Sequence, residues 1–247
     1  MNELSDAWTK FYRAEKHLET VEEILGFFAA SNKEPFIRET NCDGTHEDFR
    51  NSFAGFTLDR QTNAIFGDFI HNLRSVFDHV AMALAIKSGA SRDDRTIAFP
   101  LCDITDDFSR QKWHIKKITT PGAQAFIEGL QPYKRPSDLW PFSELEFLDN
   151  RDKHRAINLQ QLSATIETRV PYGVRVESFP DALVDGAVFM RITYPTAYSG
   201  MKVNPEVITR VFIEGKAGRI WSNAFRDSFL PLVRKEVLIE AQKRFFG

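Results

Sequence analysis

Cysteine is nearly missing from this chain: Cys42 and Cys102 are the only two in 247 residues, and they do not form a CxxC pair. Disulfide scaffolds, cysteine-rich structural zinc sites and iron–sulfur clusters all need clustered cysteines. The sequence therefore argues against these three classes of protein. We expect two thiols without a chemical role.

The chain also has no long apolar run and no excess of charge of either sign. No stretch approaches the roughly 18 apolar residues of a spanning helix, and the first residues carry charge throughout. The 32 Lys and Arg residues nearly balance the 34 Asp and Glu residues. We therefore expect a soluble, cytoplasmic protein that does not bind membranes and that meets an anionic partner only through a local patch.

Three common catalytic signatures are missing as well. The sequence contains no Gly-rich phosphate loop, no GxSxG elbow and no protein-kinase motif. Their absence weakens the case for an NTPase, a dinucleotide-binding enzyme or a serine hydrolase. We expect no cofactor.

What the chain does contain is a clear periodicity in its apolar residues, which make up 43% of the total. Spacings of three and four residues predict long helices over 5–30, 60–87, 137–153 and 222–246, with Pro231 expected to kink or restart the last, and shorter ones near 105–117 and 121–129. Alternation predicts a β-hairpin within 34–58 around a Cys-Asp-Gly-Thr turn, and a later antiparallel meander of about four strands.

These elements predict an α+β fold with three successive parts. A bundle of long helices with a β-hairpin insertion covers about 1–155, a strand-rich part about 156–220, and a closing helix about 222–246. No internal repeat, low-complexity tract or obvious linker interrupts the chain. We therefore expect a single domain over residues 1–247.

The stretch GDFIHNLRSVFDHVA, residues 67–81, places many polar groups in an otherwise apolar helix. At about 100° per residue, the apolar side chains gather on one broad face. The polar side chains form two neighbouring rows: Asp68, Asn72, Ser75 and His79 in one, and His71, Arg74 and Asp78 in the other. Short side chains of this kind suggest contact with something other than water.

A structural explanation of these rows stands beside a functional one. Arg74 and Asp78 have the spacing of an ordinary i,i+4 ion pair, and His71 and His79 can bond backbone carbonyls where the rows pack on another helix. The two histidines lie eight residues apart, about 12 Å along a helix, so they cannot chelate one ion together. We expect no metal site.

The string Arg74-Ser75-Val76-Phe77-Asp78-His79 resembles the R-x4-6-H signature of the HEPN domains. These are helical bundles of bacterial toxins and defence systems, and many are metal-independent endoribonucleases that act as dimers. The resemblance implies that His79 activates an RNA 2′-hydroxyl or protonates the leaving oxygen, while Arg74 stabilises the pentavalent phosphate. It departs from the family at Ser75, where a polar amide often stands, and in the strand-rich half that follows.

A longer pattern covers most of residues 60–156. HNLRSVFDH, followed by LQPY and then LDNRDKHR, resembles a family of bacterial proteins whose usual motifs are close to HNLRSALDHL and LNNxDKHR. This resemblance is fairly specific. It implies no particular activity.

The second polar cluster, DNRDKHR, lies where a helix is expected to give way to a strand. Cations in a last helical turn are favoured by the helix dipole, which explains Lys153 and His154 structurally. In the functional alternative the cluster faces the polar rows, and Asp152 orients a histidine or pairs with Arg74. The supporting or binding residues would then be His71, Asn72, Ser75, Asp78, Asn150, Asp152, Lys153 and His154.

The sequence RQKWHIKK, residues 110–117, surrounds a tryptophan with four cations, as single-stranded nucleic-acid binders do, although a solvated helix face also explains it.

These observations lead to two hypotheses about the function of the chain. The first is a HEPN-like endoribonuclease or RNA-binding component that uses Arg74 and His79, with RNA or another phosphate-bearing ligand as partner and a homodimer as assembly. The second is a non-catalytic binding or oligomerisation module whose polar clusters form a buried structural network.

Overall fold

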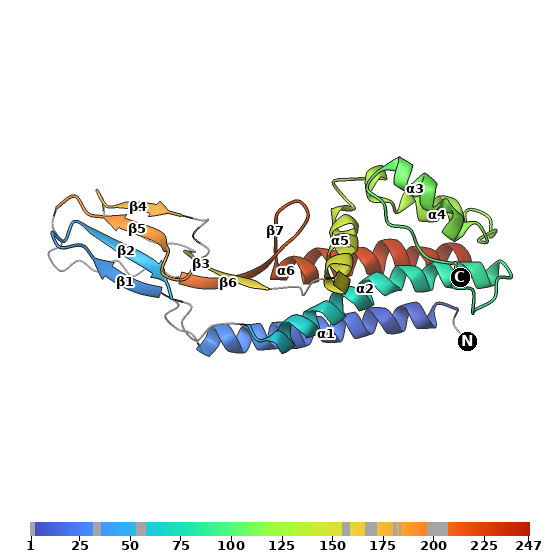
Figure 1. Cartoon of the computed structure of the whole chain (residues 1–247), viewed down its shortest axis with the longest axis horizontal. Helices are drawn as coiled ribbons and strands as arrows, with labels where there is room; N and C mark the ends of the chain where they lie inside the picture. The colour runs from blue at the N-terminus through green and yellow to red at the C-terminus, as the bar shows by residue number, and fades with distance from the viewer. Residues whose placement is uncertain are drawn as a thin grey trace. The chain divides into compact units, whose positions relative to one another are not determined.

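A computed structural model describes residues 3–31, 36–52, 58–154, 159–165, 172–179, 182, 184–196 and 207–247. The chain divides into two compact units. The helical unit comprises Met1–Val21, Arg60–Asn158 and Glu214–Gly247, and the sheet unit comprises Glu22–Asp59 and Leu159–Ile213. The α+β class with a helical bundle is confirmed (Figure 1). The expected single domain stays a prediction.

The long helices form where the apolar spacing predicted them. They are α1 (Ser5–Ser31), α2 (Arg60–Lys87) and α5 (Trp140–His154). Helix α2 buries its apolar stripe and ends at Lys87, two residues before Gly89, whose φ of +90° is the left-handed conformation that favours glycine. The Ala90 N–H donates to the Ala85 carbonyl at 2.9 Å, which closes the last turn.

The shorter helices also lie close to their predicted places. They are α3 (Thr105–Gln111), η1 (Lys112–Ile115), α4 (Ala123–Gly129) and η2 (Pro132–Lys134). The closing segment does not restart at Pro231 but runs on as α6 (Ser222–Ala224), η3 (Phe225–Phe229), α7 (Leu230–Leu232), η4 (Val233–Ile239) and η5 (Gln242–Phe246). The segments η3, η4 and η5 are π-helical. Wider turns next to a proline are reasonable, because its nitrogen cannot donate an α-helical hydrogen bond.

Phenylalanine side chains hold the helical unit together. Phe66 on α2 meets Phe225 of η3 edge to face at 5.0 Å between ring centroids. About three turns further along α2, Phe77 meets Phe142 of α5 at 5.0 Å in the same geometry. The apolar face of α2 is therefore covered by α5 and the closing helix, which leaves its polar rows at the edges of this core.

The sheet unit contains a four-stranded antiparallel sheet. Its strands are β1 (Phe36–Thr40), β2 (His46–Asn51), β5 (Val188–Thr193) and β4 (Arg175–Ser178), in that order. The predicted hairpin is confirmed: Gly44 has a φ of +68°, and Asp43 Oδ1 accepts a hydrogen bond from the Thr45 N–H at 2.9 Å. The buried core of the sheet consists of Phe49, Phe189, Met190, Ile192 and Tyr194.

The later strands do not form a simple meander in chain order. Strand β5 pairs with β2 of the hairpin as well as with β4, while β3 (Gln160–Thr165) pairs with β6 (Val207–Glu214). Strand β7 (Arg219–Trp221) follows β6 after a short turn. Alternation along one strand determines which of its faces is buried but not which strand becomes its neighbour. The predicted meander order of the strands was therefore wrong, although β3, β4, β5 and β6 lie where alternation predicted strands.

Candidate functional site

Arg74, on α2, is enclosed by groups of its own chain. Its Nε donates to Glu146 Oε2 of α5 at 2.5 Å, and its Nη2 donates to the Phe99 carbonyl at 2.9 Å. Its Nη1 lies 3.2 Å from Asp78 Oδ1, one turn along α2, and the side chain is only 12% exposed. The Arg74 guanidinium therefore connects α2, α5 and the loop that carries Phe99.

The carboxylates beside Arg74 stabilise its charge. Burial alone would lower the pKa of Arg74, but the carboxylates of Asp78 and Glu146 outweigh burial and raise that pKa above its ordinary value. Asp78 also accepts a hydrogen bond from the Phe99 N–H at 2.8 Å, through the same Oδ1 that faces Arg74. The charges of the cluster are thus paired with one another, although the buried Arg74 Nη1 makes no hydrogen bond to a described residue.

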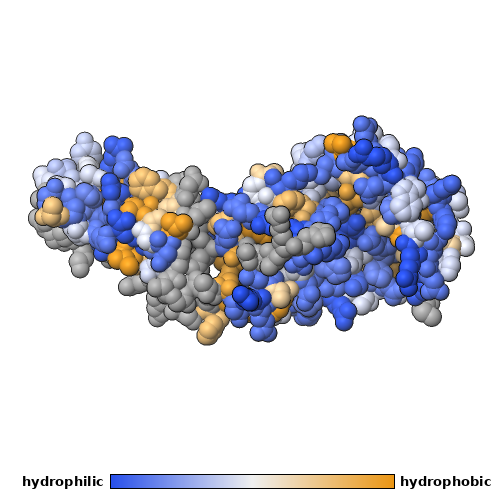
Figure 2. Space-filling model, in the orientation of Figure 1, coloured by the Kyte–Doolittle hydropathy of each residue, from blue (hydrophilic) through white to orange (hydrophobic). Residues whose placement is uncertain are grey.

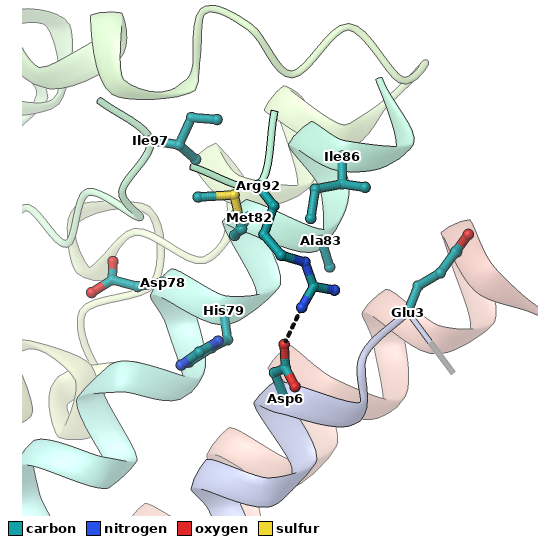
Figure 3. A pocket seen from close by; sticks show the side chains of 9 residues that line it. All are labelled: Glu3, Asp6, Asp78, His79, Met82, Ala83, Ile86, Arg92 and Ile97. Carbon is teal, nitrogen blue, oxygen red and sulfur yellow. Dashed lines mark hydrogen bonds and ion pairs between the residues drawn. The ribbon is translucent and has the colours of Figure 1, made fainter. Parts of the chain in front are cut away.

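His79 lies beside a pocket of about 270 Å³ in the helical unit (Figure 3). Its ring makes no hydrogen bond to any residue that the structure describes. Burial, followed by the positive charge of Lys10, lowers the pKa of His79 below its ordinary value, although Asp6 and Asp78 act in the opposite direction. The imidazole is therefore mostly neutral at pH 7 and able to accept a hydrogen bond.

The pocket has an apolar side and a charged side. Met82, Ala83 and Ile86 of α2 form the apolar side with Ile97, and Arg92 reaches across to Asp6 at 3.4 Å (Figure 3). The remaining lining residues are Glu3, Asp78 and His79.

Arg74 and His79 therefore face different surroundings. Arg74 is not among the residues that line the pocket, and its hydrogen bonds lead to α5 and Phe99. His79 lines the pocket together with residues of α1 and of the Arg92 loop. Five residues along a helix correspond to about 140° of rotation, which explains the separation. Asp78 is the one residue that both contacts Arg74 and lines the pocket.

The cluster at the end of α5 faces α2, as the functional alternative expected. Asp149 is almost fully buried. Its Oδ1 lies 3.0 Å from His71 Nδ1, and its Oδ2 lies 2.6 Å from Lys153 Nζ. Asn72 is buried on the α1 side of α2, where its Nδ2 donates to the Asp68 carbonyl at 2.7 Å and its Oδ1 accepts from Lys10 at 3.4 Å. His71 and Asn72 thus each tie α2 to a neighbouring helix.

The remaining candidate residues have smaller or different roles. Asp152 does not pair with Arg74 and instead lies against Gly67 of α2, where a Cβ atom would come within 2.7 Å of Oδ1. Asn150 donates to Glu146 Oε1 at 3.0 Å. Ser75 is half-buried without a hydrogen bond to a described residue. The side chain of His154 lies outside the described residues.

The basic segment 110–117 is partly neutralised by nearby acids. Arg110 pairs with Asp107, and Lys117 pairs with Asp94 at 2.5 Å. Trp113 is exposed and stacks on His114. The segment therefore presents an aromatic surface with fewer uncompensated cations than its sequence indicates.

Sequence reasoning missed the partners that decide this arrangement. Asp149 opens the DNRDKHR cluster but was not among the named candidates, and Glu146 lies one turn before Asn150. The i,i+4 spacings of Asp149 with Lys153 and of Glu146 with Asn150 were usable signals. Glu3, Asp6 and Arg92 carried no such signal, because they come from separate segments that only folding brings to His79.

The described residues contain no group of three His, Cys, Asp or Glu side chains that could hold a metal ion. Within the same residues, no helix has the length and apolar character needed to cross a membrane.

The chain matches no protein-family model, no curated protein and no solved structure. Its function must therefore be argued from the chemistry of its own residues.

Proposed function

We propose that this chain is a non-catalytic binding module. In this proposal Arg74 and its carboxylate partners fix α2 against α5, and the pocket beside His79 is the binding site. The observation that carries the proposal is the enclosure of Arg74, whose Nε, Nη1 and Nη2 all face Glu146, Asp78 or the Phe99 carbonyl. Nη1 makes an ion contact but no hydrogen bond to a described residue, and because it is buried the guanidinium offers little to a phosphate without rearrangement.

The HEPN-like endoribonuclease is less well supported by the same geometry. In that mechanism Arg74 and His79 act on one phosphate, so both must reach a common space. Arg74 would have to leave Glu146 and Phe99 to do so, which would leave buried polar groups without partners. The pocket beside His79, in contrast, is open without any such rearrangement.

Incubation with single-stranded RNA tests the choice between these functions. The experiment compares the unaltered protein with Arg74→Ala, His79→Ala and, as a matched histidine control on α1, His17→Ala. We expect no cleavage above background from any of the four, with and without EDTA. Cleavage by the unaltered protein that survives EDTA and is lost in His79→Ala, but not in His17→Ala, would overturn the binding module in favour of the nuclease.

A further inference from the structure

The pocket beside His79 is large enough for a small ligand. Its volume of about 270 Å³ lies just below the usual range for ligand pockets, and residues from the start of α1, from α2 and from the Arg92 loop converge on it. The visible face of the protein shows hydrophobic residues only in small groups (Figure 2). The pocket is a concave feature of the helical unit that can accommodate a partner.

The charge of the lining selects one class of ligand. Among the described lining residues, Glu3, Asp6 and Asp78 supply three carboxylates and Arg92 is the one permanent cation; Lys10, outside the lining, also acts on His79. Both interactions that hold Asp78 use Oδ1, so its second oxygen is not needed to fix Arg74. The neutral His79 ring adds an acceptor rather than a positive charge. The pocket therefore favours a cation over an anion.

The ion pair between Arg92 and Asp6 is weak enough to be replaced. Its atoms are 3.4 Å apart, and the two side chains are 73% and 56% exposed. Exposed pairs of this kind contribute little to stability. A ligand ammonium group can therefore take the place of the Arg92 guanidinium beside Asp6 at small cost.

The apolar side of the pocket determines the rest of the ligand. Met82, Ile86 and Ile97 offer hydrocarbon surface but no hydrogen-bonding group, so they favour a short alkyl or aryl part. We propose that the pocket binds a small organic ammonium ion, with its charged end among Asp6, Asp78 and His79 and its apolar end against Met82 and Ile86. This inference rests on the proposed binding function and names its ligand class.

The test is a titration followed by two-dimensional NMR of the labelled full-length chain, with the His79 ring as reporter. The probes are n-pentylamine, the uncharged 1-pentanol, the anion pentanoate and inorganic phosphate. We expect saturable shifts at His79 with the amine alone. Asp6→Asn should weaken amine binding by about tenfold, since it removes a charged partner. Asp138→Asn, an exposed substitution away from the pocket with the same change in net charge, should leave amine binding unchanged.

Arg92→Gln gives the sharpest outcome, because the two possible charges of the ligand predict opposite results. It should tighten binding of the amine by several-fold, as Asp6 loses its competing partner. If pentanoate or phosphate binds instead and Arg92→Gln abolishes that binding, the ammonium ligand is wrong while the binding function stands. If no probe of either charge shifts the His79 signal, both proposals fail.

Discussion

The two units use buried charge in different ways. In the sheet unit, Asp48 of β2 receives two hydrogen bonds from Arg191, at 2.6 and 2.8 Å, and Arg191 lies directly opposite Asp48 in the register of β2 and β5. In the helical unit, Arg74 joins three segments at a helix crossing, and its partner Asp78 also borders a pocket. Cross-strand pairs fix register and close the space between strands, whereas pairs at a helix edge leave room for a ligand.

All four tryptophans lie in the helical unit, so unfolding of this unit can be followed separately from that of the whole chain. Trp8, Trp113, Trp140 and Trp221 fall within its three segments. Tryptophan fluorescence therefore reports unfolding of the helical unit, while far-UV circular dichroism reports both units. Substitutions in one unit can be followed for their effect on the other.

The largest expected effect comes from Phe49→Ala in the sheet unit. Phe49 is fully buried in the sheet core, and truncation of such a side chain costs about 3–5 kcal/mol of unfolding free energy. If the chain is the predicted single domain, urea unfolding will shift the fluorescence and circular-dichroism midpoints together. A fluorescence midpoint that does not move would contradict the single domain. Phe27→Ala, at a residue 77% exposed, is the matched control and should cost less than about 0.5 kcal/mol.

Arg74→Ala should destabilise the helical unit by about 3 kcal/mol. It leaves Glu146 Oε2 and the Phe99 carbonyl oxygen without the donor that Arg74 supplies, in a part-buried place. The measurement is the tryptophan-detected urea midpoint. Arg244→Ala removes an exposed i,i+4 pair with Glu240 and should change stability by only about 0.3 kcal/mol. Equal midpoints for the two variants would show that the Arg74 cluster has no structural role.

Replacing two helical glycines by alanine should change the unfolding free energy in opposite directions. Gly67→Ala gains about 1 kcal/mol of helix propensity but places a methyl group against the Asp152 carboxylate, an overpacking cost of about 1–3 kcal/mol. We expect a net loss of about 1 kcal/mol. Gly26→Ala on α1 meets no atom within 4 Å and should stabilise by up to about 1 kcal/mol. Stabilisation by both substitutions in thermal unfolding would show that α2 and α5 do not need the glycine.

Features of the fold that depend on local spacing could be predicted from the sequence, whereas those that depend on contacts between distant residues could not. The bounds of α2 depend on local spacing and on the Ser88-Gly89 stop, and they were predicted closely. The i,i+4 contact of Arg74 with Asp78 was anticipated for the same reason. The pairing of β2 with β5 depends on residues about 140 positions apart, and no local pattern specifies it. Asp6 and Arg92 likewise meet only after folding.

The smallest expected effect is the contribution of His79 to the pH dependence of stability. It tests whether His79 lies in a different electrostatic environment from an ordinary surface histidine. Burial first, then the positive charge of Lys10 and, to a smaller degree, that of Arg92 lower the pKa of His79 against the opposing carboxylates of Asp6 and Asp78. The folded chain thus binds a proton less readily than the unfolded chain, so stability is present above pH about 6.5 and is lost as the pH falls below it.

The loss should be under about 1 kcal/mol, because His79 is only half-buried. His79→Gln should therefore flatten the rise of the tryptophan-detected unfolding free energy between about pH 5 and 7, relative to His17→Gln as the matched control. If the two variants show the same slope, His79 is solvated like an ordinary surface histidine. An ammonium ligand bound at Asp6 and Asp78 would add a positive charge beside His79 and lower the pKa of His79 further. Saturation with n-pentylamine should therefore make the rise of the unfolding free energy with pH steeper in the unaltered protein but not in His79→Gln.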